Sequence, residues 1–175
     1  DVDYLAGHYG IQAVYCPVGY NDAYTQDVGN PAKSIDISFV GSPFKRRLAL
    51  LETLAEKAQE KGWHLQVYGP FYESKHFWKK YLLARKYPHL MRYVQNRSVL
   101  PEEAVEIYAQ SKICLTIHGS ANRSLNPRTF EIMATGSLEL LDAHEDYAGL
   151  VRPGQDVAVF ADAEDLLQQS AYYLT

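Results

Sequence analysis

The sequence predicts an α/β fold built on an open parallel sheet with helices on both faces. Short apolar runs typical of buried strands alternate with longer segments that have the helical period. Several runs end in small or polar residues that signal the start of a helix. The chain has 175 residues, of which 47% are hydrophobic and 22% charged, which suits one globular domain with a full core.

The first part of the chain differs in composition from the rest. Residues 11–16 form a short apolar run that predicts a strand, and the following stretch is rich in glycine, asparagine, aspartate and proline. We therefore expect an N-terminal strand and linker segment at residues 1–33, followed by a compact domain at 34–175.

The compact domain is expected to open with a strand at 36–40. Ser42 is placed to cap the next helix and Pro43 to start it. Leucine and alanine then recur at the helical period until Gly62. A second strand is expected at 64–68.

The middle of the chain is basic and aromatic. Residues 71–97 predict a broken helix and then a strand near 92–94. A proline and two glutamates at 101–103 begin a helix that we expect to run through 111, because the helix dipole favours acids in the first turn.

The next apolar run, 113–118, predicts a buried strand. It is followed by a loop and by a helix at 127–134, with Pro127 in the first helical position. In this helix we expect Phe130, Met133 and Ala134 to face inward. Strands at 137–141 and 157–160 and a final helix capped by Asp162 complete the pattern.

The helix that begins at Pro127 is the best candidate for a binding site. It starts beyond the carboxyl end of a strand, where open parallel sheets bind ligands. Unpaired N–H groups from Asn126 to Thr129 and the positive end of the dipole would attract phosphate, and Arg128 could clasp it. Glu131 could accept hydrogen bonds from ribose hydroxyls. The alternative is a solvent-exposed pair of Arg128 and Glu131 without function.

A second basic group is expected at the same end of the sheet. Gly41 and Ser42 end the strand at 36–40, so their backbone can approach a ligand closely. Arg47 begins the sheet-facing stripe of the next helix and points to the carboxyl end, where Lys45 or Arg46 could join it. His118 ends the later strand and is a candidate acid, base or hydrogen-bond donor, or a histidine that holds the loop backbone.

The charges are sorted along the chain. Residues 45–128 contain 15 lysines or arginines and seven glutamates, whereas 129–175 contain one arginine and nine acids. The first stretch would draw an acidic ligand, although helix surfaces also scatter such charges freely. The basic aromatic stretch 75–92 also permits a nucleic-acid surface, with a surface helix that has an aromatic inner face as the more common explanation.

Several functions are excluded by missing patterns. The sequence has neither a glycine-rich dinucleotide fingerprint nor a Walker loop, and its histidines show no metal-ligand spacing. Cys16 and Cys114 are expected to be two buried thiols. Apolar runs are too short to span a bilayer and the N-terminus lacks signal-peptide features, so we expect a cytoplasmic protein without an integral membrane segment.

The ordered set of motifs resembles the nucleotide-sugar-binding, C-terminal half of a GT-B glycosyltransferase, nearest to the CgeB-like group and to glycosyl transferases group 1. The matching segments lie at 36–42, 68–70, 101–103, 109–113, 126–131 with Gly136, 141–142 and 165–174. The resemblance implies a Rossmann-like domain that binds a UDP- or GDP-linked sugar without a further cofactor. It also implies an acceptor-binding N-terminal domain in the same protein, because one half of the fold holds only the donor.

The resemblance also assigns roles to residues. Gly41, Ser42 and Arg47 would approach the pyrophosphate, Arg128 and its neighbours the distal phosphate, and Glu131 the ribose. The segment before residue 101 would border the base. Retaining relatives carry a Glu-x7-Glu signature whose second glutamate matches Glu131. Its first position is Arg123 in this chain, which could serve as another phosphate ligand.

The leading hypothesis is therefore the donor-binding domain of a hexosyltransferase-like enzyme, retaining by resemblance, that transfers a glycosyl group to an unknown acceptor. The donor-binding candidates are Gly41, Ser42, Arg46, Arg47, Arg123, Asn126, Arg128, Thr129 and Glu131, with His118 as the catalytic candidate. The arginine at position 123 favours a second hypothesis, a nucleotide- or sugar-sensing module without turnover. A nucleic-acid-binding domain is the third.

Overall fold

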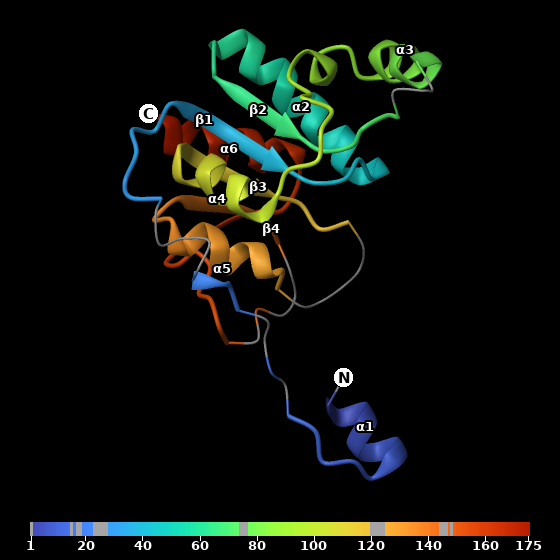
Figure 1. Cartoon of the computed structure of the whole chain (residues 1–175), viewed down its shortest axis with the longest axis vertical. Helices are drawn as coiled ribbons and strands as arrows, with labels where there is room; N and C mark the ends of the chain where they lie inside the picture. Colours follow the sequence, from blue (N-terminus) through green and yellow to red (C-terminus); the bar gives the residue numbers. More distant parts are fainter. Residues whose placement is uncertain are drawn as a thin grey trace.

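The structure is a computed structural model that describes residues 2–14, 16, 19–22, 28–73, 77–119, 125–143, 147 and 149–175. Its strands are β1 (Ile35–Val40), β2 (Leu65–Tyr68), β3 (Ser111–Thr116), β4 (Leu138–Asp142) and β5 (Ala158–Phe160). Its helices are α1 (Val2–Tyr9), α2 (Lys45–Lys61), α3 (Phe77–Lys86), α4 (Pro101–Ala109), α5 (Pro127–Ala134) and α6 (Ala163–Leu174), with a 3-10 helix, η2, at Leu90–Arg92. Figure 1 shows their arrangement.

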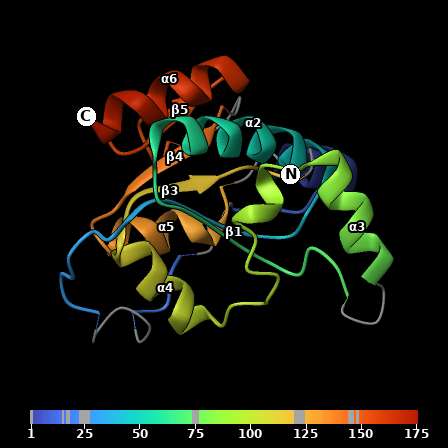
Figure 2. The same cartoon turned by 90° about the horizontal axis from the view of Figure 1, so that it is seen from above.

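Within the described residues the strands form a five-stranded sheet in the order β2-β1-β3-β4-β5, and every pair is parallel. Ile37 of β1 lies opposite Leu65 of β2 on one side and Ile113 of β3 on the other. Figure 2 shows α2 and α6 on one side of the sheet and α4 and α5 on the other. The α/β class and the Rossmann-like arrangement expected from the sequence are confirmed.

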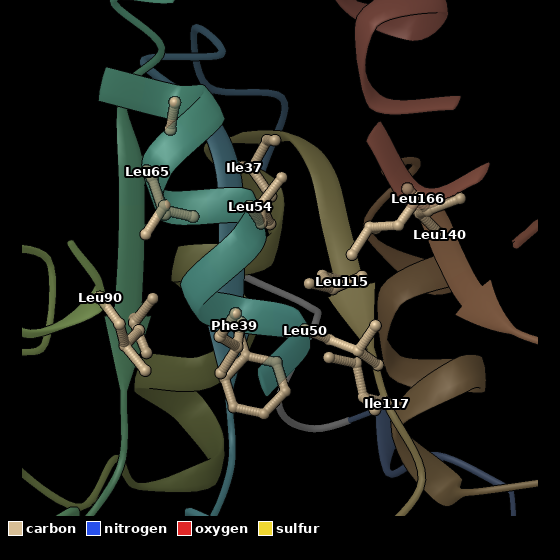
Figure 3. Close-up of a cluster of buried hydrophobic side chains, with 14 of the residues drawn as sticks. Ile37, Phe39, Leu50, Leu54, Leu65, Leu90, Leu115, Ile117, Leu140 and Leu166 are labelled. Carbon is tan, nitrogen blue, oxygen red and sulfur yellow. The ribbon is translucent and has the colours of Figure 1, made fainter. Parts of the chain in front are cut away.

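The main core lies between the sheet and the pair of helices α2 and α6. Alternate residues of the strands, such as Ile37 and Phe39, face Leu54 of α2, and Leu166 of α6 covers Leu140 of β4 (Figure 3). These side chains are almost completely removed from water. Burial of this kind stabilises the folded state by about 25 cal/mol for each Å² of apolar surface. The packed core therefore holds the strands, and with them the strand ends, in fixed positions.

Helix α2 begins later than the sequence suggested. Its N-cap is Phe44, and no side chain caps the first turn, so the predicted capping role of Ser42 is wrong. The backbone N–H of Phe44 instead bonds to the carbonyl of Ser42 at 3.0 Å, which makes residues 42–44 a tight turn after β1. The predicted end of α2 is confirmed, because Gly62 adopts a left-handed conformation with φ of 70° and its N–H bonds to the carbonyl of Ala58.

The N-terminal segment also differs from expectation. Residues 2–9 form helix α1, which lies apart from the sheet in Figure 1 and has no buried residue. Residues 11–14 and 16 are not in a strand, so that prediction is wrong for these residues. No described strand pairs with residues 11–14 or 16, and apolar side chains alone do not make a strand.

Two further predictions are corrected. The expected strand near 92–94 is reduced to η2 and a single bridge between Val94 and Val67 of β2. In α5, Met133 and Ala134 are exposed and Phe130 is half-buried, whereas Thr129 and Ile132 face the interior. The i,i+3 pair Thr129 and Ile132 therefore defines the buried face of the helix.

The thiol of Cys114 is buried as expected, but Cys16 is exposed, so the prediction of two buried thiols is wrong for Cys16. The cap predicted at Asp162 is confirmed, since its side chain accepts the N–H groups of Glu164 and Asp165.

Among the described helices, none has the length and apolar character needed to cross a membrane.

Candidate functional site

The strand order places a topological switch point between β1 and β3. From β1 the chain crosses to β2 on one side, and from β3 it crosses to β4 on the other. The connecting helices α2 and α5 therefore cover opposite faces, as Figure 2 shows. Open α/β sheets bind ligands outside the carboxyl ends of the strands at such a point. Gly41 follows β1 here, and His118 follows β3.

Glycines allow the loops at this end of the sheet to pack closely. Gly69, after β2, has φ of 153°, and a Cβ there would lie 2.0 Å from the carbonyl oxygen of Gly41. Gly119, after β3, is covered by the ring of Phe44, which a Cβ would approach to 2.5 Å. The loops after β1, β2 and β3 thus touch one another through positions where no side chain fits.

Arg47 joins two of these loops from the first turns of α2. Its Nε donates to the carbonyl oxygen of Ile117 at 2.6 Å, and its Nη1 donates to that of Ser42 at 3.1 Å. Its guanidinium group lies 4.9 Å from the ring centroid of Phe44. Arg47 reaches the expected end of the sheet, but only 7% of its surface is exposed. Arg47 would therefore contact a phosphate through the guanidinium N–H groups that these two hydrogen bonds do not use.

The charges of Arg47 and Arg128 act on the same region. Burial lowers the pKa of Arg47, the positive charge of Arg128 lowers it further, and the negative charge of Asp142 opposes both. The two arginines come from α2 and α5, on opposite faces of the sheet, yet they lie near enough to repel. An anion placed between them would relieve this repulsion.

Helix α5 begins as predicted, with Asn126 as its N-cap. The side chain of Asn126 accepts the N–H of Arg128 at 3.1 Å, and its carbonyl oxygen accepts the N–H of Thr129 at 2.9 Å. The expectation that these N–H groups are unpaired is therefore wrong. What the first turn offers an anion is the helix dipole and the side chain of Arg128.

Arg128 is held by Tyr108 of α4. Its Nε donates to the Tyr108 hydroxyl at 3.0 Å. Burial raises the pKa of Tyr108 to about 12, although Arg128 opposes the rise, so the phenol stays neutral and orients the fork. Glu131 shares this face: its half-buried position raises its pKa, and the charge of Arg128 partly offsets that effect. Arg128 and Glu131 are thus not a fully solvated surface pair.

Thr129 points away from this face. Its hydroxyl donates to the Glu139 carboxyl at 3.1 Å inside the protein, where both side chains are buried. Burial raises the pKa of Glu139, and the nearby hydroxyl groups of Thr116 and Thr129 partly offset the rise. The predicted donor role of Thr129 therefore cannot use its side chain in this arrangement, and the hydroxyl instead fixes α5 against β4.

Asp142, at the carboxyl end of β4, connects two candidate residues. Its Oδ1 accepts the backbone N–H of His118 at 3.0 Å and lies 2.5 Å from Nδ1 of the same ring. Its Oδ2 pairs with Nη1 of Arg46. Burial alone would raise the pKa of Asp142, but the hydrogen bonds from His118 and Arg46 outweigh it and keep the pKa below its ordinary value.

Asp142 and Tyr108 were not among the candidates from the sequence. Asp142 carried a usable signal, because it is the polar residue that ends an apolar strand, as His118 does. Tyr108 carried no such signal, since nothing in the sequence of α4 indicates that its hydroxyl accepts a hydrogen bond from Arg128, 20 residues further along the chain. Arg123 falls at 120–124, outside the described residues, so its role stays a prediction.

An all-parallel five-stranded sheet with helices on both faces defines a Rossmann-like α/β domain. The family model described as glycosyl transferase-like matches residues 46–175. The chain therefore belongs to this glycosyl transferase-like family. Among curated proteins, none matches the chain in sequence.

Solved structures of similar fold include GT-B glycosyltransferases. A glycosyltransferase from Rickettsia africae superposes with a TM-score of 0.65 at 17% identity, over 98% of this chain and 50% of that one. A sucrose-phosphate synthase from Thermosynechococcus elongatus gives 0.58 at 17% identity, over 98% and 46%. A GtfA/B complex gives 0.53 at 11%, over 99% and 36%. The chain thus spans half or less of these proteins and has the fold of one GT-B half.

Proposed function

We propose that this chain is the C-terminal, donor-binding half of a GT-B glycosyltransferase of CgeB-like type. It binds a UDP- or GDP-linked sugar and, together with an acceptor-binding domain of the same protein, transfers the glycosyl group. The observation that carries the proposal is that Arg47 of α2, bonded to the carbonyl of Ile117 after β3, and Arg128, in the first turn of α5, both stand at the switch point. The family match and the half-length superpositions support it.

In this proposal the side chains of the site bind different parts of the donor. Arg128 is oriented by Tyr108, which leaves the rest of its guanidinium fork for a phosphate. Glu131 is three residues further along α5, where it accepts hydrogen bonds from ribose hydroxyls in this proposal. Gly41 and Ser42 bring backbone close to the pyrophosphate, and Asn126 holds the start of α5.

The chemical step that this half assists is departure of the nucleoside diphosphate. Negative charge grows on the leaving phosphate as the glycosidic bond breaks, and fixed positive groups stabilise that charge. Arg47, Arg128 and the dipole of α5 supply such groups, so the proposal requires no divalent metal. His118 is the proposed proton carrier or sugar ligand, with a ring oriented by the Asp142 carboxylate.

Titration calorimetry with UDP, GDP and their sugars tests the proposal. We expect binding by the wild-type chain and at least a roughly tenfold loss of affinity, about 1.4 kcal/mol, in Arg128→Ala and in Glu131→Ala. Binding that is absent at millimolar ligand, or unchanged in both variants, contradicts the assignment.

Matched substitutions away from the site control for general effects. Arg92→Ala removes an exposed arginine that bonds to Gln59, and Glu60→Ala removes an exposed glutamate paired with Lys57. Both residues belong to the helical layer of α2 and η2 rather than to the switch point. We expect both variants to bind the nucleotide as the wild type does.

A nucleotide- or sugar-sensing module is the second candidate, and the arginine at position 123 favours it. A retaining transferase of the resembled type has a glutamate there, and arginine cannot act as its carboxylate. Assaying the full-length protein for glycosyl transfer and for donor hydrolysis separates the two functions. A sensor binds the nucleotide sugar without turnover, whereas a transferase consumes it.

A further inference from the structure

We propose that Asp142 is a positioning residue of the donor site, which sets the places of Arg46 and His118 without touching the ligand itself. The inference rests on the proposed function, because it concerns how the same site binds a diphosphate. It adds a residue from β4 to a site otherwise built from the loops after β1 and β3 and from helices α2, α4 and α5.

The geometry shows one carboxylate holding two separate segments. Oδ1 accepts the backbone N–H of His118 and lies within hydrogen-bond distance of Nδ1 of its ring. Oδ2 forms an ion pair with Arg46 of α2. Only 1% of Asp142 is exposed, whereas the side chain of Arg46 is half-exposed and reaches toward solvent from this anchor. A buried anchor with an exposed partner is the arrangement expected when a side chain is oriented for an incoming group.

Asp142 is also a negative charge inside a site that should attract anions. Its charge acts on Arg47, and the charge of Arg128 acts on Glu139 of the same strand as Asp142. By Coulomb attraction alone, removing the Asp142 charge would leave the site more positive and tighten the binding of a diphosphate. If Asp142 positions Arg46 and His118, removing its charge instead weakens binding of the diphosphate, because both side chains lose the group that orients them.

The chain contains a matched carboxylate at the other end of the sheet. Asp36 of β1 accepts the backbone N–H of His64 at 2.8 Å and pairs with Lys112 at 2.6 Å. It therefore combines one backbone N–H with one long cation, as Asp142 does. Asp36→Asn removes the same charge from the molecule while leaving the carboxyl end of the sheet intact.

The experiment compares UDP binding by the wild-type chain, Asp142→Asn and Asp36→Asn at several salt concentrations. We expect Asp142→Asn to weaken binding about tenfold, and Asp36→Asn to stay within about twofold of wild type. Equal or tighter binding by Asp142→Asn overturns the proposal, because the carboxylate would then act only as a charge.

A double substitution shows whether Asp142 acts through Arg46. If it does, Asp142→Asn weakens binding much less in an Arg46→Gln background than in the wild type, because the side chain to be positioned is already gone. Full additivity of the two substitutions overturns this part of the proposal. Such coupling is not expected from a loss of stability alone.

Amide hydrogen exchange provides a readout without ligand. We expect the His118 amide to exchange at least tenfold faster in Asp142→Asn and at the wild-type rate in Asp36→Asn. Unchanged exchange in Asp142→Asn overturns the positioning role. If the wild type binds neither UDP nor GDP, the proposed function fails, and the exchange rates still decide whether Asp142 holds His118.

Discussion

Arg47 lies where the loops after β1 and β3 meet, and it makes a different hydrogen bond to each. Nε and Nη1 point toward Ile117 and Ser42, and the planar guanidinium fork fixes the angle between these two donors. A lysine has one terminal nitrogen and cannot reproduce both contacts from the same position. At the scale of single residues, this arginine determines the geometry of the switch point.

The first prediction follows from that geometry. We expect Arg47→Lys to lower the free energy of unfolding by about 1–3 kcal/mol, because buried carbonyl groups lose their charged donor. Arg92→Lys, on the exposed surface of η2, should change it by less than about 0.5 kcal/mol. Urea unfolding of both variants checks the difference, and equal stabilities would show that the two hydrogen bonds of Arg47 contribute nothing net.

The second prediction concerns Glu139 and pH. Burial raises its pKa above the unfolded value of 4.5, so the folded protein holds this proton more tightly than the unfolded chain does. The resulting stability is fully present below pH 4.5 and is lost as pH rises through the folded-state pKa. Relative to Glu139→Gln, the wild type should therefore become less stable across that window.

Denaturant unfolding between about pH 4 and 8 measures how stability changes with pH. Glu106→Gln, at an exposed position of α4, is the matched control and should follow the wild-type profile. Parallel profiles for the wild type and Glu139→Gln would contradict the assignment of a raised pKa to this carboxyl group.

The sequence located part of the candidate site, because the rule for parallel sheets depends on order along the chain. Arg47 and Arg128 each follow a predicted strand, so both could be assigned to the carboxyl end before the structure was known. The contacts of Tyr108 and Asp142 could not be predicted, since they join residues from different elements through side-chain geometry. The pairing of the α5 N–H groups with Asn126 was missed for a related reason, because a cap and an anion compete for the same donors.

At the scale of elements, α2 is the helix that covers the centre of the sheet. Leu54 is completely buried against the strands, whereas Leu82 of α3 is 52% exposed. We expect Leu54→Ala to cost about 2–5 kcal/mol of stability, because it leaves a cavity under the helix. Leu82→Ala should cost less than about 0.5 kcal/mol. Thermal or urea unfolding measures both, and comparable losses would contradict the core in Figure 3.

Most elements were predictable because their periodicity and their end signals agree. Helix α5 has its start signals at Asn126 and Pro127, and its bounds are as predicted, although its buried face is formed by Thr129 and Ile132. The start of α2 was misplaced because Ser42 and Pro43 are good starting residues in isolation. In the structure, the carbonyl oxygen of Ser42 instead accepts hydrogen bonds from Arg47 and from the backbone N–H of Phe44, and the helix begins only after Phe44. A tertiary contact thus overrides a local preference.

At the scale of the whole molecule, the N-terminal segment contributes little to the packed body. Helix α1 has no buried residue, and residues 10–14 are likewise exposed or half-exposed. We expect deletion of residues 2–14 to change the unfolding midpoint by no more than about 2 °C, since few apolar contacts are lost. Calorimetry checks this, and a markedly lower midpoint would show that the compact domain extends into this segment.

The outermost strands of the sheet also bear on how the isolated chain behaves in solution. β2 has four residues and β5 has three, so neither offers a long ladder to a second copy. The middle of β2 is already occupied, because Val67 donates to the carbonyl of Tyr93 and accepts the N–H of Gln95. Self-association by strand addition is therefore disfavoured, which makes this polypeptide a tractable subject for concentrated samples in spectroscopy.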